Sequence, residues 1–426
     1  MSDLLDDLQA RGLVQDSTDL DALADRLAEG PIGLYYGCDP SAPSLHAGNL
    51  IGLLVLRRFA EAGHRPFALV GGATGMIGDP GGRSEERNLL DDATLAANVA
   101  GIAGQVDRIV GEVATVVDNR DWTAGIGVLE FLRDVGKHVT VNQMLAKESV
   151  KGRVQSEHGI SYTEFSYMLL QANDYWHLHA HEGVELQIGG SDQWGNLVAG
   201  VDLIRRRSQA SAHAFTWPLI TRADGAKFGK STGGAIWLDP DQTSPYQFFQ
   251  YWMNVDDRDV ERFLLQLTLL GTDEVRDVMG VHADAPQQRA AQRRLAHEIT
   301  TIVHGLDAAH AAAEATAALF GGDPTDASEA AWQVVAAEVE AVGPPHGASV
   351  AESIDPVPVL VGAGLAKSNS DARRLVKDGA VRVTGRVLGD GDRIGADDVR
   401  HGRYVLLARG RKAFAVLDLE KDPPSS

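Results

Sequence analysis

Cysteine is almost absent from this sequence: Cys38 is the only one among 426 residues. An internal disulfide and a zinc site built from several cysteines are therefore excluded. The fourteen histidines are scattered, and no HExxH or comparable spacing indicates a metal site. The chain has no apolar run of bilayer length, and its first residues lack the basic start and apolar segment of a secretory signal. We therefore expect a cytoplasmic protein with no membrane partner and no metal ligands.

Positive charge is scarce except near the end of the chain. The net charge is −20, which argues against a polyanionic partner because nucleic-acid binding needs lysine and arginine at the contact surface. Residues 356–412, however, contain twelve Lys and Arg against six Asp and Glu, a balance of +6, so the other residues carry −26. This charge distribution alone leaves two interpretations open, a nucleic-acid-binding module and a chance fluctuation in a small domain.

The first half of the chain alternates strand and helix patterns. Apolar segments at 33–37, 65–70 and 113–117 are typical of buried strands, and glycine loops or turns separate them from helical patterns. We expect a helix after the first strand, with Ser44 as its N-cap. This alternation predicts an α/β, Rossmann-like doubly wound parallel sheet, whose ligands bind beyond the carboxyl ends of the strands.

The second half has a different pattern. Helical, alanine-rich stretches extend from about Ser244 to Phe320, and a module with one helical segment and several strands follows them. We therefore expect an α-helical domain and then a small α+β domain. The expected boundaries are 1–240 for the α/β catalytic domain, 241–342 for the helical domain, 343–353 for a linker, 354–420 for the small domain and 421–426 for a tail.

The string HAGN, at residues 46–49, opens the helix expected after the first strand. Unpaired backbone N–H groups and the helix dipole attract phosphate at such a position. His46 and Asn49 are three residues apart and face the same way, and Gly48 leaves room for a nucleotide. An ordinary capped helix with a surface histidine is the alternative for this string taken alone.

A second string, KFGKS at residues 227–231, is a basic, glycine-containing loop. Lys227 and Lys230 are flexible point charges that can follow a leaving pyrophosphate and neutralise charge in a transition state. A solvated surface loop is the alternative. Found together, the two strings favour ATP chemistry, and in this order they resemble the two signatures of class I aminoacyl-tRNA synthetases.

Two further segments have the composition of a small-molecule site. On a helix over 162–174, Tyr167, Gln171 and Asp174 form one polar stripe, which either lines a pocket or faces solvent. Residues 187–196 place amides and a carboxylate among glycines after an apolar strand. Loops of this kind bring the backbone close to ligands, and a plain strand-to-helix turn would not require so many polar groups.

Over nearly its whole length the chain resembles bacterial-type tyrosyl-tRNA synthetases. The strings that carry the resemblance are LYYGCDPSAPSLHAGN, ALVGGATGMIGDP, FLRDVGKH, EFSYMLLQANDY, LQIGGSDQWGN, KFGKS and GLAKSNSDARRLVKDGAVRVTG. The last string resembles an RNA-binding domain first recognised in a small-subunit ribosomal protein. This resemblance implies that the basic module binds RNA. The chain departs from the usual family pattern at Tyr36, at Asn49 in place of histidine, and at Phe228 and Gly229.

The resemblance implies roles for individual residues. Tyrosine binding is expected of Tyr35, Asp79, Tyr167, Gln171, Asp174 and Gln187. ATP binding is expected of Gly37, Asp39, Ser41, His46, Gly48, Gly190, Asp192, Lys230 and Ser231. The expected catalytic residues are His46, Asn49, Gln193, Lys227 and Lys230. Binding of tRNA is expected of Arg205, Arg206, Arg207, Lys367, Arg373, Arg374, Lys377 and Arg382, although three arginines at a helix end are also typical of a solvated surface.

The resemblance also implies a reaction and its partners. L-tyrosine would react with ATP, accompanied by Mg²⁺, to give tyrosyl adenylate, and the tyrosyl group would pass to tRNA(Tyr) on a homodimer. The helical domain would bind the anticodon. The alternatives are a tryptophanyl-type synthetase, a related nucleotidylyltransferase and a catalytically silent RNA-binding paralogue. Tyr35 and Asp174 favour tyrosine, because polar groups placed to meet a hydroxyl are left unpaired by phenylalanine.

Overall fold

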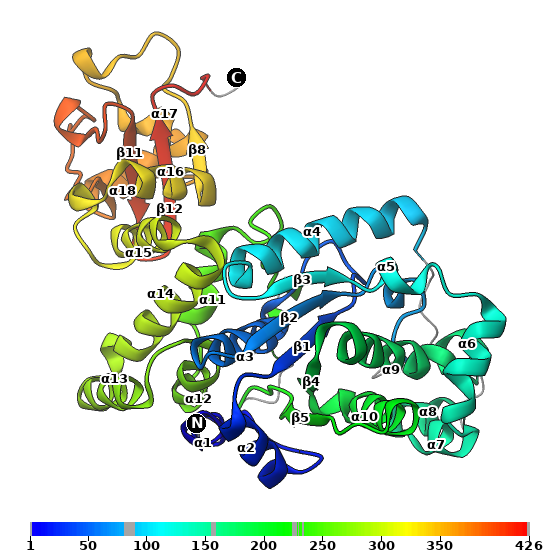
Figure 1. The fold of residues 1–426 in the computed structure, drawn as a ribbon. Helices are drawn as coiled ribbons and strands as arrows, with labels where there is room; N and C mark the ends of the chain where they lie inside the picture. The colour runs from blue at the N-terminus through cyan, green and yellow to red at the C-terminus, as the bar shows by residue number, and fades with distance from the viewer. Residues whose placement is uncertain are drawn as a thin grey trace. The chain divides into compact units, whose positions relative to one another are not determined.

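A computed structural model of the chain describes residues 2–80, 90–154, 159–223, 228, 230–231 and 234–423. The chain divides into two compact units. Unit 1 comprises Met1–Thr243 and Asn254–Leu295, and unit 2 comprises Ser244–Met253 and Ala296–Ser426. Each unit contains a sheet and helices that pack on it (Figure 1). The finer division into catalytic, helical and small domains stays a prediction.

The sheet of unit 1 is parallel and has the strand order β3-β2-β1-β4-β5. Its strands are β1 (Gly33–Cys38), β2 (Arg65–Val70), β3 (Thr115–Asp118), β4 (Val184–Gly190) and β5 (His213–Trp217). The strand order reverses direction between β1 and β4, and doubly wound sheets bind ligands at such a point. The predicted Rossmann-like fold is therefore confirmed, as are the three strands expected from the sequence.

Helices cover both faces of the central strand β1. On one face, the ring of Tyr36 packs against Gly52 of α3 (Leu50–Glu61). A Cβ atom added to Gly52 would lie only 2.4 Å from the Tyr36 ring. On the other face, Tyr35 packs on Tyr175 of α9 (Tyr162–Glu182), with ring centroids 5.4 Å apart. Helix α4 (Asp92–Val110) packs beside α3, and α10 (Trp194–Ser208) packs beside α9 (Figure 1). The strand is buried on both faces, which explains its unbroken apolar sequence.

The helix after β1 begins differently from the prediction. A single 3₁₀ turn over Ala47–Asn49 precedes α3, and its N-cap is His46, whose Nδ1 accepts a hydrogen bond from the Gly48 N–H at 3.0 Å. The predicted cap, Ser44, is buried and donates its hydroxyl to the carbonyl of Leu45 at 2.7 Å. The prediction was wrong because a histidine two residues later satisfies the same backbone donors.

Further helices complete unit 1. They are α1 (Ser2–Ala10), α2 (Leu20–Glu29), α5 (Arg120–Thr123), α6 (Val128–Asp134), α7 (Val141–Ala146), α8 (Glu148–Val154), α12 (Asp257–Leu267) and α13 (Thr272–Asp284). Two short strands, β6 (Lys230–Ser231) and β7 (Gly234–Ala235), form an antiparallel pair. Helix α14 (Ala290–His304) begins in unit 1 and ends in unit 2. Within the described parts of both units, no helix is long and apolar enough to cross a membrane.

Unit 2 contains a mixed sheet of order β10-β9-β11-β12-β8. Its strands are β8 (Glu340–Val342), β9 (Val381–Val383), β10 (Arg386–Val387), β11 (Tyr404–Arg409) and β12 (Ala413–Asp418). Its helices are α11 (Pro245–Met253), α15 (Leu306–Phe320), α16 (Glu329–Glu338), α17 (Pro356–Gly362) and α18 (Asn369–Lys377). The helical segment and the strands predicted for the last module are confirmed by α18 and by β9, β10, β11 and β12, and α17 adds a second helix. Strand β8 precedes the residue at which the small domain was expected to begin.

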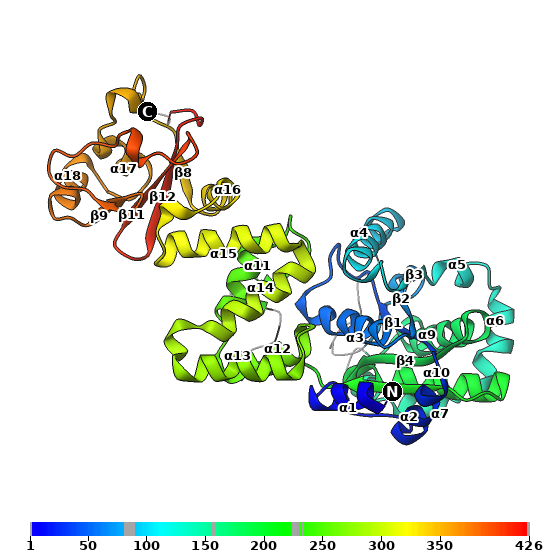
Figure 2. The same ribbon diagram turned by 60° about the vertical axis from the view of Figure 1, so that its left-hand side comes forward.

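The sheet of unit 2 lies between two groups of helices (Figure 2). Val405 and Leu407 of β11 belong to the same buried cluster as residues of α17 and α18. The alternate residue Tyr404 stacks on Trp332 of α16, with ring centroids 6.0 Å apart and an interplanar angle of 5°. Successive side chains of a strand point to opposite faces of the sheet. Strand β11 therefore contacts α17 and α18 on one face and α16 on the other.

Candidate active site

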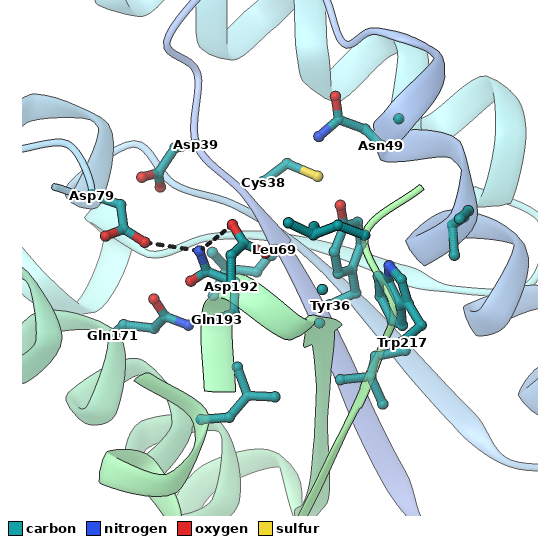
Figure 3. A pocket seen from close by; sticks show the side chains of 18 of the residues that line it. Tyr36, Cys38, Asp39, Asn49, Leu69, Asp79, Gln171, Asp192, Gln193 and Trp217 are labelled. Carbon is teal, nitrogen blue, oxygen red and sulfur yellow. Dashed lines mark hydrogen bonds between the residues drawn. The ribbon is translucent and has the colours of Figure 1, made fainter. Parts of the chain in front are cut away.

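A pocket of about 660 Å³ lies in unit 1, where β1 and β4 diverge. Its size and place suit a small-molecule substrate at the switch point of a doubly wound sheet. Most of the predicted tyrosine and ATP residues line it, and Figure 3 shows several of them from close by. The predicted residues in its wall are Tyr35, Gly37, Asp39, Ser41, His46, Gly48, Asn49, Asp79, Tyr167, Gln171, Asp174, Gln187, Gly190, Asp192 and Gln193. The structure therefore gathers segments that are far apart in the sequence into one site.

Asp174 is a buried carboxylate in this pocket, and only 2% of the residue is exposed. The amide nitrogen of Asn119 donates to its Oδ2 at 2.9 Å, and the indole N–H of Trp122 donates to its Oδ1 at 2.8 Å. Burial raises the pKa of Asp174 to about 7, and these two donors oppose the rise. Above pH 7, Asp174 is mainly ionised and is an acceptor whose oxygens are held in place by these two donors.

Three buried polar atoms of the pocket have no hydrogen-bond partner among the described residues. They are the hydroxyl of Tyr35 and the side-chain carbonyl oxygens of Gln171 and Gln187. Burial, and next the nearby Asp174 carboxylate, raise the pKa of Tyr35 well above its usual value, so it stays a neutral donor. Unpaired buried groups of this kind cost about 1–3 kcal/mol each, and a polar ligand would satisfy them.

Asp79 lies at another wall of the pocket, beside Gln193 and Gln171 (Figure 3). Its Oδ2 accepts hydrogen bonds from Gln193 Nε2 at 2.8 Å and from Asn196 Nδ2 at 3.1 Å. Its Oδ1 lies 3.5 Å from the ammonium nitrogen of Lys147. A carboxylate held in this way can bind a substrate ammonium group.

Asp39 links the β1 turn to two other segments. Its Oδ1 accepts from the Thr74 hydroxyl and its Oδ2 accepts from the Tyr167 hydroxyl, both at 2.7 Å. Burial, and then Asp39, raise the pKa of Tyr167 well above its usual value, so it also stays a donor. Tyr167 was expected to bind the substrate tyrosine, and in this structure its hydroxyl donates to Asp39.

The HAGN string contributes His46, Gly48 and Asn49 to the pocket wall. His46 Nδ1 accepts from Gly48 N–H, and the amide oxygen of Asn49 accepts from the backbone N–H of His46 at 3.1 Å. A neutral imidazole that accepts at Nδ1 carries its proton on Nε2, so His46 is prepared to donate from that atom. The side-chain oxygen of Asn49 stabilises the turn, and the expected catalytic role of Asn49 stays a prediction.

Sequence reasoning gave no role to several residues of the pocket. Tyr36 and Trp217 pack together beside the opening, with ring centroids 5.7 Å apart, and Cys38 lies near them (Figure 3). Asn119 and Trp122, which hold Asp174, also had no assigned role. A signal for Asn119 existed, because it follows directly after the predicted strand that forms β3, and ligands of parallel sheets bind beyond the carboxyl ends of the strands.

Part of the KFGKS string lies outside the described residues, including Lys227. The backbone of Lys230 and Ser231 forms β6, which pairs with Gly234 and Ala235. Phe228 lines the pocket, and its ring centroid lies 5.1 Å from that of Phe263 on α12. The string therefore reaches the site, while the expected roles of both lysines stay predictions.

The predicted tRNA-binding arginines of α10 have partners within the chain. Arg205 forms an ion pair with Asp202 at 2.9 Å, and Arg206 donates to the carbonyl of His138. The guanidinium carbon of Arg207 lies 3.4 Å from the ring centroid of Trp176. These contacts restrain the three side chains, of which Arg205 and Arg206 are exposed.

In unit 2, the predicted tRNA-binding residues share one region around α18 and β9. All of them are exposed: Lys367, Arg373, Arg374, Lys377 and Arg382. Arg382 donates to the carbonyl of Gly410 at 3.0 Å, and Arg409 donates to the carbonyl of Leu365 at 2.7 Å. The first bond joins β9 to the β11–β12 turn, and the second joins β11 to a residue that precedes α18. Exposed Arg411 and Lys412 in the turn add positive charge. Exposed cations can contact a phosphate backbone, and the expected role of these residues in tRNA binding stays a prediction.

Two family models match this chain. One, described as class I tRNA synthetases (W and Y), matches residues 27–321, and the other, a tyrosine–tRNA ligase SYY-like C-terminal domain, matches residues 342–417. The chain belongs to the class I tRNA synthetases of the tryptophan and tyrosine type. ATP is a substrate of this family, as expected from the sequence.

Individual relatives are similar over nearly the full chain. A tyrosine–tRNA ligase of Streptomyces griseus is 49% identical over 426 residues, covering 98% of this chain and 99% of the relative. The ligase of Mycobacterium tuberculosis is 47% identical over 425 residues, covering 97% and 98%. Among solved structures, a C-terminally truncated mitochondrial tyrosyl-tRNA synthetase of Aspergillus nidulans is 32% identical with a TM-score of 0.67, covering 72% of this chain and 92% of that one.

Proposed function

We propose that this chain is a tyrosine–tRNA ligase that activates L-tyrosine with ATP and then transfers the tyrosyl group to the 3′-terminal adenosine of tRNA(Tyr). The relatives that match nearly all of the chain are tyrosine–tRNA ligases, which favours this function over a tryptophanyl-type enzyme. In the first step the tyrosine carboxylate attacks the α-phosphorus of ATP, the α-phosphorus–oxygen bond to the β-phosphate breaks, and pyrophosphate leaves. No side chain needs to act as a nucleophile.

The choice of tyrosine rests on the pocket wall formed by Tyr35 and Asp174. Asp174 accepts hydrogen bonds from Asn119 and Trp122 yet still lines the pocket, and the Tyr35 hydroxyl near it has no partner within the described chain. A phenolic hydroxyl can donate to Asp174 and accept from Tyr35. Phenylalanine would leave both groups unpaired, which costs about 1–3 kcal/mol for each neutral group and more for a charged one.

The remaining residues would bind either the ammonium group of tyrosine or the phosphates of ATP. Asp79, with Tyr167 and Gln171 nearby, would hold the substrate ammonium, and His46 and Gln193 would stabilise charge on the α-phosphate and carboxylate. Lys227 and Lys230 would follow the pyrophosphate. Mg²⁺ would arrive with the triphosphate, because this ion usually binds substrate phosphates rather than an all-protein cage.

The second step requires tRNA, and the basic surface of unit 2 supplies a binding region. We infer that α18 and β9 contact the phosphate backbone, that the helices before them contact the anticodon arm, and that Arg205 and Arg206 lie near the acceptor end. A protein that charges tRNA works where tRNA is used, so we also infer a cytoplasmic location. Salt dependence of tRNA binding would test the electrostatic part of this proposal.

We further propose a homodimer that forms through α6 and α7. These helices expose large apolar side chains, with Val128 75% and Leu129 83% exposed, and Leu132, Val141 and Leu145 add to them. Soluble proteins rarely leave so many apolar side chains uncovered, and a second copy of the chain is the occupant we propose. Leu129→Asp should give a monomer in sedimentation at micromolar concentration. A variant that stays dimeric would place the interface elsewhere.

Amino-acid-dependent exchange of pyrophosphate into ATP tests the activation step without tRNA. Exchange with tyrosine but not with tryptophan or phenylalanine is the expected result. Exchange with tryptophan alone would favour the tryptophanyl alternative. An absence of exchange with all three amino acids would instead favour a silent RNA-binding paralogue.

A further inference from the structure

Lys147 is a buried cation behind the pocket wall that carries Asp79. It stands between α7 and α8, and only 7% of its side chain is exposed. Its Nζ lies 2.6 Å from Oδ1 of Asn196 and 3.5 Å from Oδ1 of Asp79. Lys147 is not among the described residues that line the pocket, so it would act on a ligand through these two partners.

A lysine at this position fixes the direction of the Asn196 amide. An ammonium group only donates hydrogen bonds, so it must meet the carbonyl oxygen of Asn196. The amide nitrogen of Asn196 is then directed to Oδ2 of Asp79 at 3.1 Å and to Oε1 of Gln193 at 2.9 Å. With the amide reversed, an oxygen would face the carboxylate, and three favourable contacts would be lost.

The same lysine supplies positive charge in an acidic pocket. Four carboxylates line the site, those of Asp39, Asp79, Asp174 and Asp192, and the described lining contains no lysine or arginine. Burial lowers the pKa of Lys147, whereas the carboxylate of Asp79 opposes that shift by stabilising the cation. A buried charge is retained only where it is paired and hydrogen-bonded, and Lys147 and Asp79 meet that condition for each other.

The path of the Lys147 side chain depends on Gly195 at the start of α10. A Cβ on Gly195 would lie 3.1 Å from Cγ of Lys147, so the absence of a side chain leaves space for the lysine stem. The stem thus crosses from the α7–α8 junction to the first turn of α10. It connects a segment outside the pocket with the carboxylate inside it.

We propose that Lys147 is a positioning residue for the subsite that binds the substrate ammonium, acting by orienting Asn196 and Asp79 and by balancing the charge of Asp79. The proposal rests on the proposed function, in which Asp79 receives the ammonium of tyrosine. It predicts a selective effect. Loss of Lys147 should weaken the binding of a ligand that carries an ammonium group and leave the binding of a ligand without one unchanged. A role in folding alone would not distinguish the two ligands.

The test compares two ligands on the full-length protein. KM and kcat for tyrosine are measured by ATP–pyrophosphate exchange, and 3-(4-hydroxyphenyl)propanoate, which lacks the ammonium group, is measured as a competitive inhibitor. For Lys147→Met we expect the KM for tyrosine to rise about tenfold or more, as for one lost hydrogen bond to a charged group, with kcat changed less than about threefold. The inhibition constant of the propanoate should stay at its wild-type value.

Two further variants sharpen the result. Lys151→Met removes an exposed lysine one helical turn later and should match the wild type for both ligands. Lys147→Gln keeps a hydrogen-bond donor for Asn196 without the charge, so its KM for tyrosine should rise less than that of Lys147→Met. If Lys147→Met does not fold, the same two ligands are measured on Lys147→Gln instead. An unchanged KM for tyrosine, or an equal loss for both ligands, would overturn the proposal. An absence of tyrosine exchange in the wild type would instead overturn the proposed function on which it rests.

Discussion

Replacing Trp122 by phenylalanine should make tyrosine binding strongly dependent on pH. The indole N–H is one of two donors that hold the buried Asp174 carboxylate, and burial has already raised the pKa of that group to about 7. A hydrogen bond to a charged group contributes about 1.5–3 kcal/mol, and 1.36 kcal/mol corresponds to one pKa unit, so the variant pKa should rise by about one to two units. Phenylalanine keeps an aromatic ring against His177, which stacks on Trp122 with ring centroids 4.5 Å apart.

The direction of the effect follows from the charge of Asp174. The tyrosine hydroxyl donates to the ionised carboxylate, so affinity falls as pH drops through the pKa. For a rise of about 1.5 units, the ratio of variant to wild-type KM should be roughly thirtyfold near pH 6, roughly eightfold at pH 7.5 and about twofold at pH 8.5. Pyrophosphate exchange across this range measures the ratio. The wild type should itself lose tyrosine affinity below pH 7.

A second tryptophan provides a matched control. Trp176 donates its N–H to the Ser208 hydroxyl at 2.9 Å and lies outside the pocket, so Trp176→Phe should follow the wild-type pH profile. If the KM ratio for Trp122→Phe were the same at every pH, the hydrogen bond would not control the ionisation of Asp174. The reasoning from burial and donors would then be refuted.

Three further substitutions test other parts of the structure. Tyr35→Phe removes an unpaired buried hydroxyl, so the preference for tyrosine over phenylalanine in exchange assays should fall about tenfold, while urea unfolding should show the free protein stabilised by about 1 kcal/mol. Gly52→Ala places a Cβ 2.4 Å from the Tyr36 ring and should cost about 1–3 kcal/mol in unfolding and raise the KM for ATP; an unchanged stability would contradict this packing. Lys377→Glu should raise the KM for tRNA in aminoacylation and flatten its dependence on salt, without changing pyrophosphate exchange; equal effects on both assays would exclude a role confined to tRNA.

The sequence predicted those features that depend on local patterns. Apolar runs located β1 and β2, because parallel strands covered on both faces are apolar throughout. Helical spacing placed Tyr167, Gln171 and Asp174 on one stripe, and all three line the pocket. Because both signals arise within about twenty neighbouring residues, they require no knowledge of the tertiary fold.

The contacts that hold the pocket carboxylates were not predictable in the same way. Asn119 and Trp122 are 55 and 52 residues from Asp174, and Asn196 is 117 residues from Asp79. Nothing in the neighbourhood of these donors indicates which carboxylate they will meet, since the pairing is decided by the order of strands in the sheet. The wrong N-cap at Ser44 has a related cause: Gln105, 61 residues away, lies 3.2 Å from its hydroxyl and helps to hold it in the interior.

Lys147 lies between the exposed apolar surface of α7 and the Asp79 carboxylate in the pocket. Helix α7, which carries exposed Val141 and Leu145, ends one residue before Lys147, whose ammonium group reaches Asp79 in the pocket. A second subunit that covers these apolar side chains would restrain α7 and, through it, the lysine. The orientation of Asn196 and Asp79 would then depend on the state of the α7 surface. Because the connection is a chain of short contacts, dimer formation and recognition of the tyrosine ammonium are expected to be coupled, with Lys147 as the link.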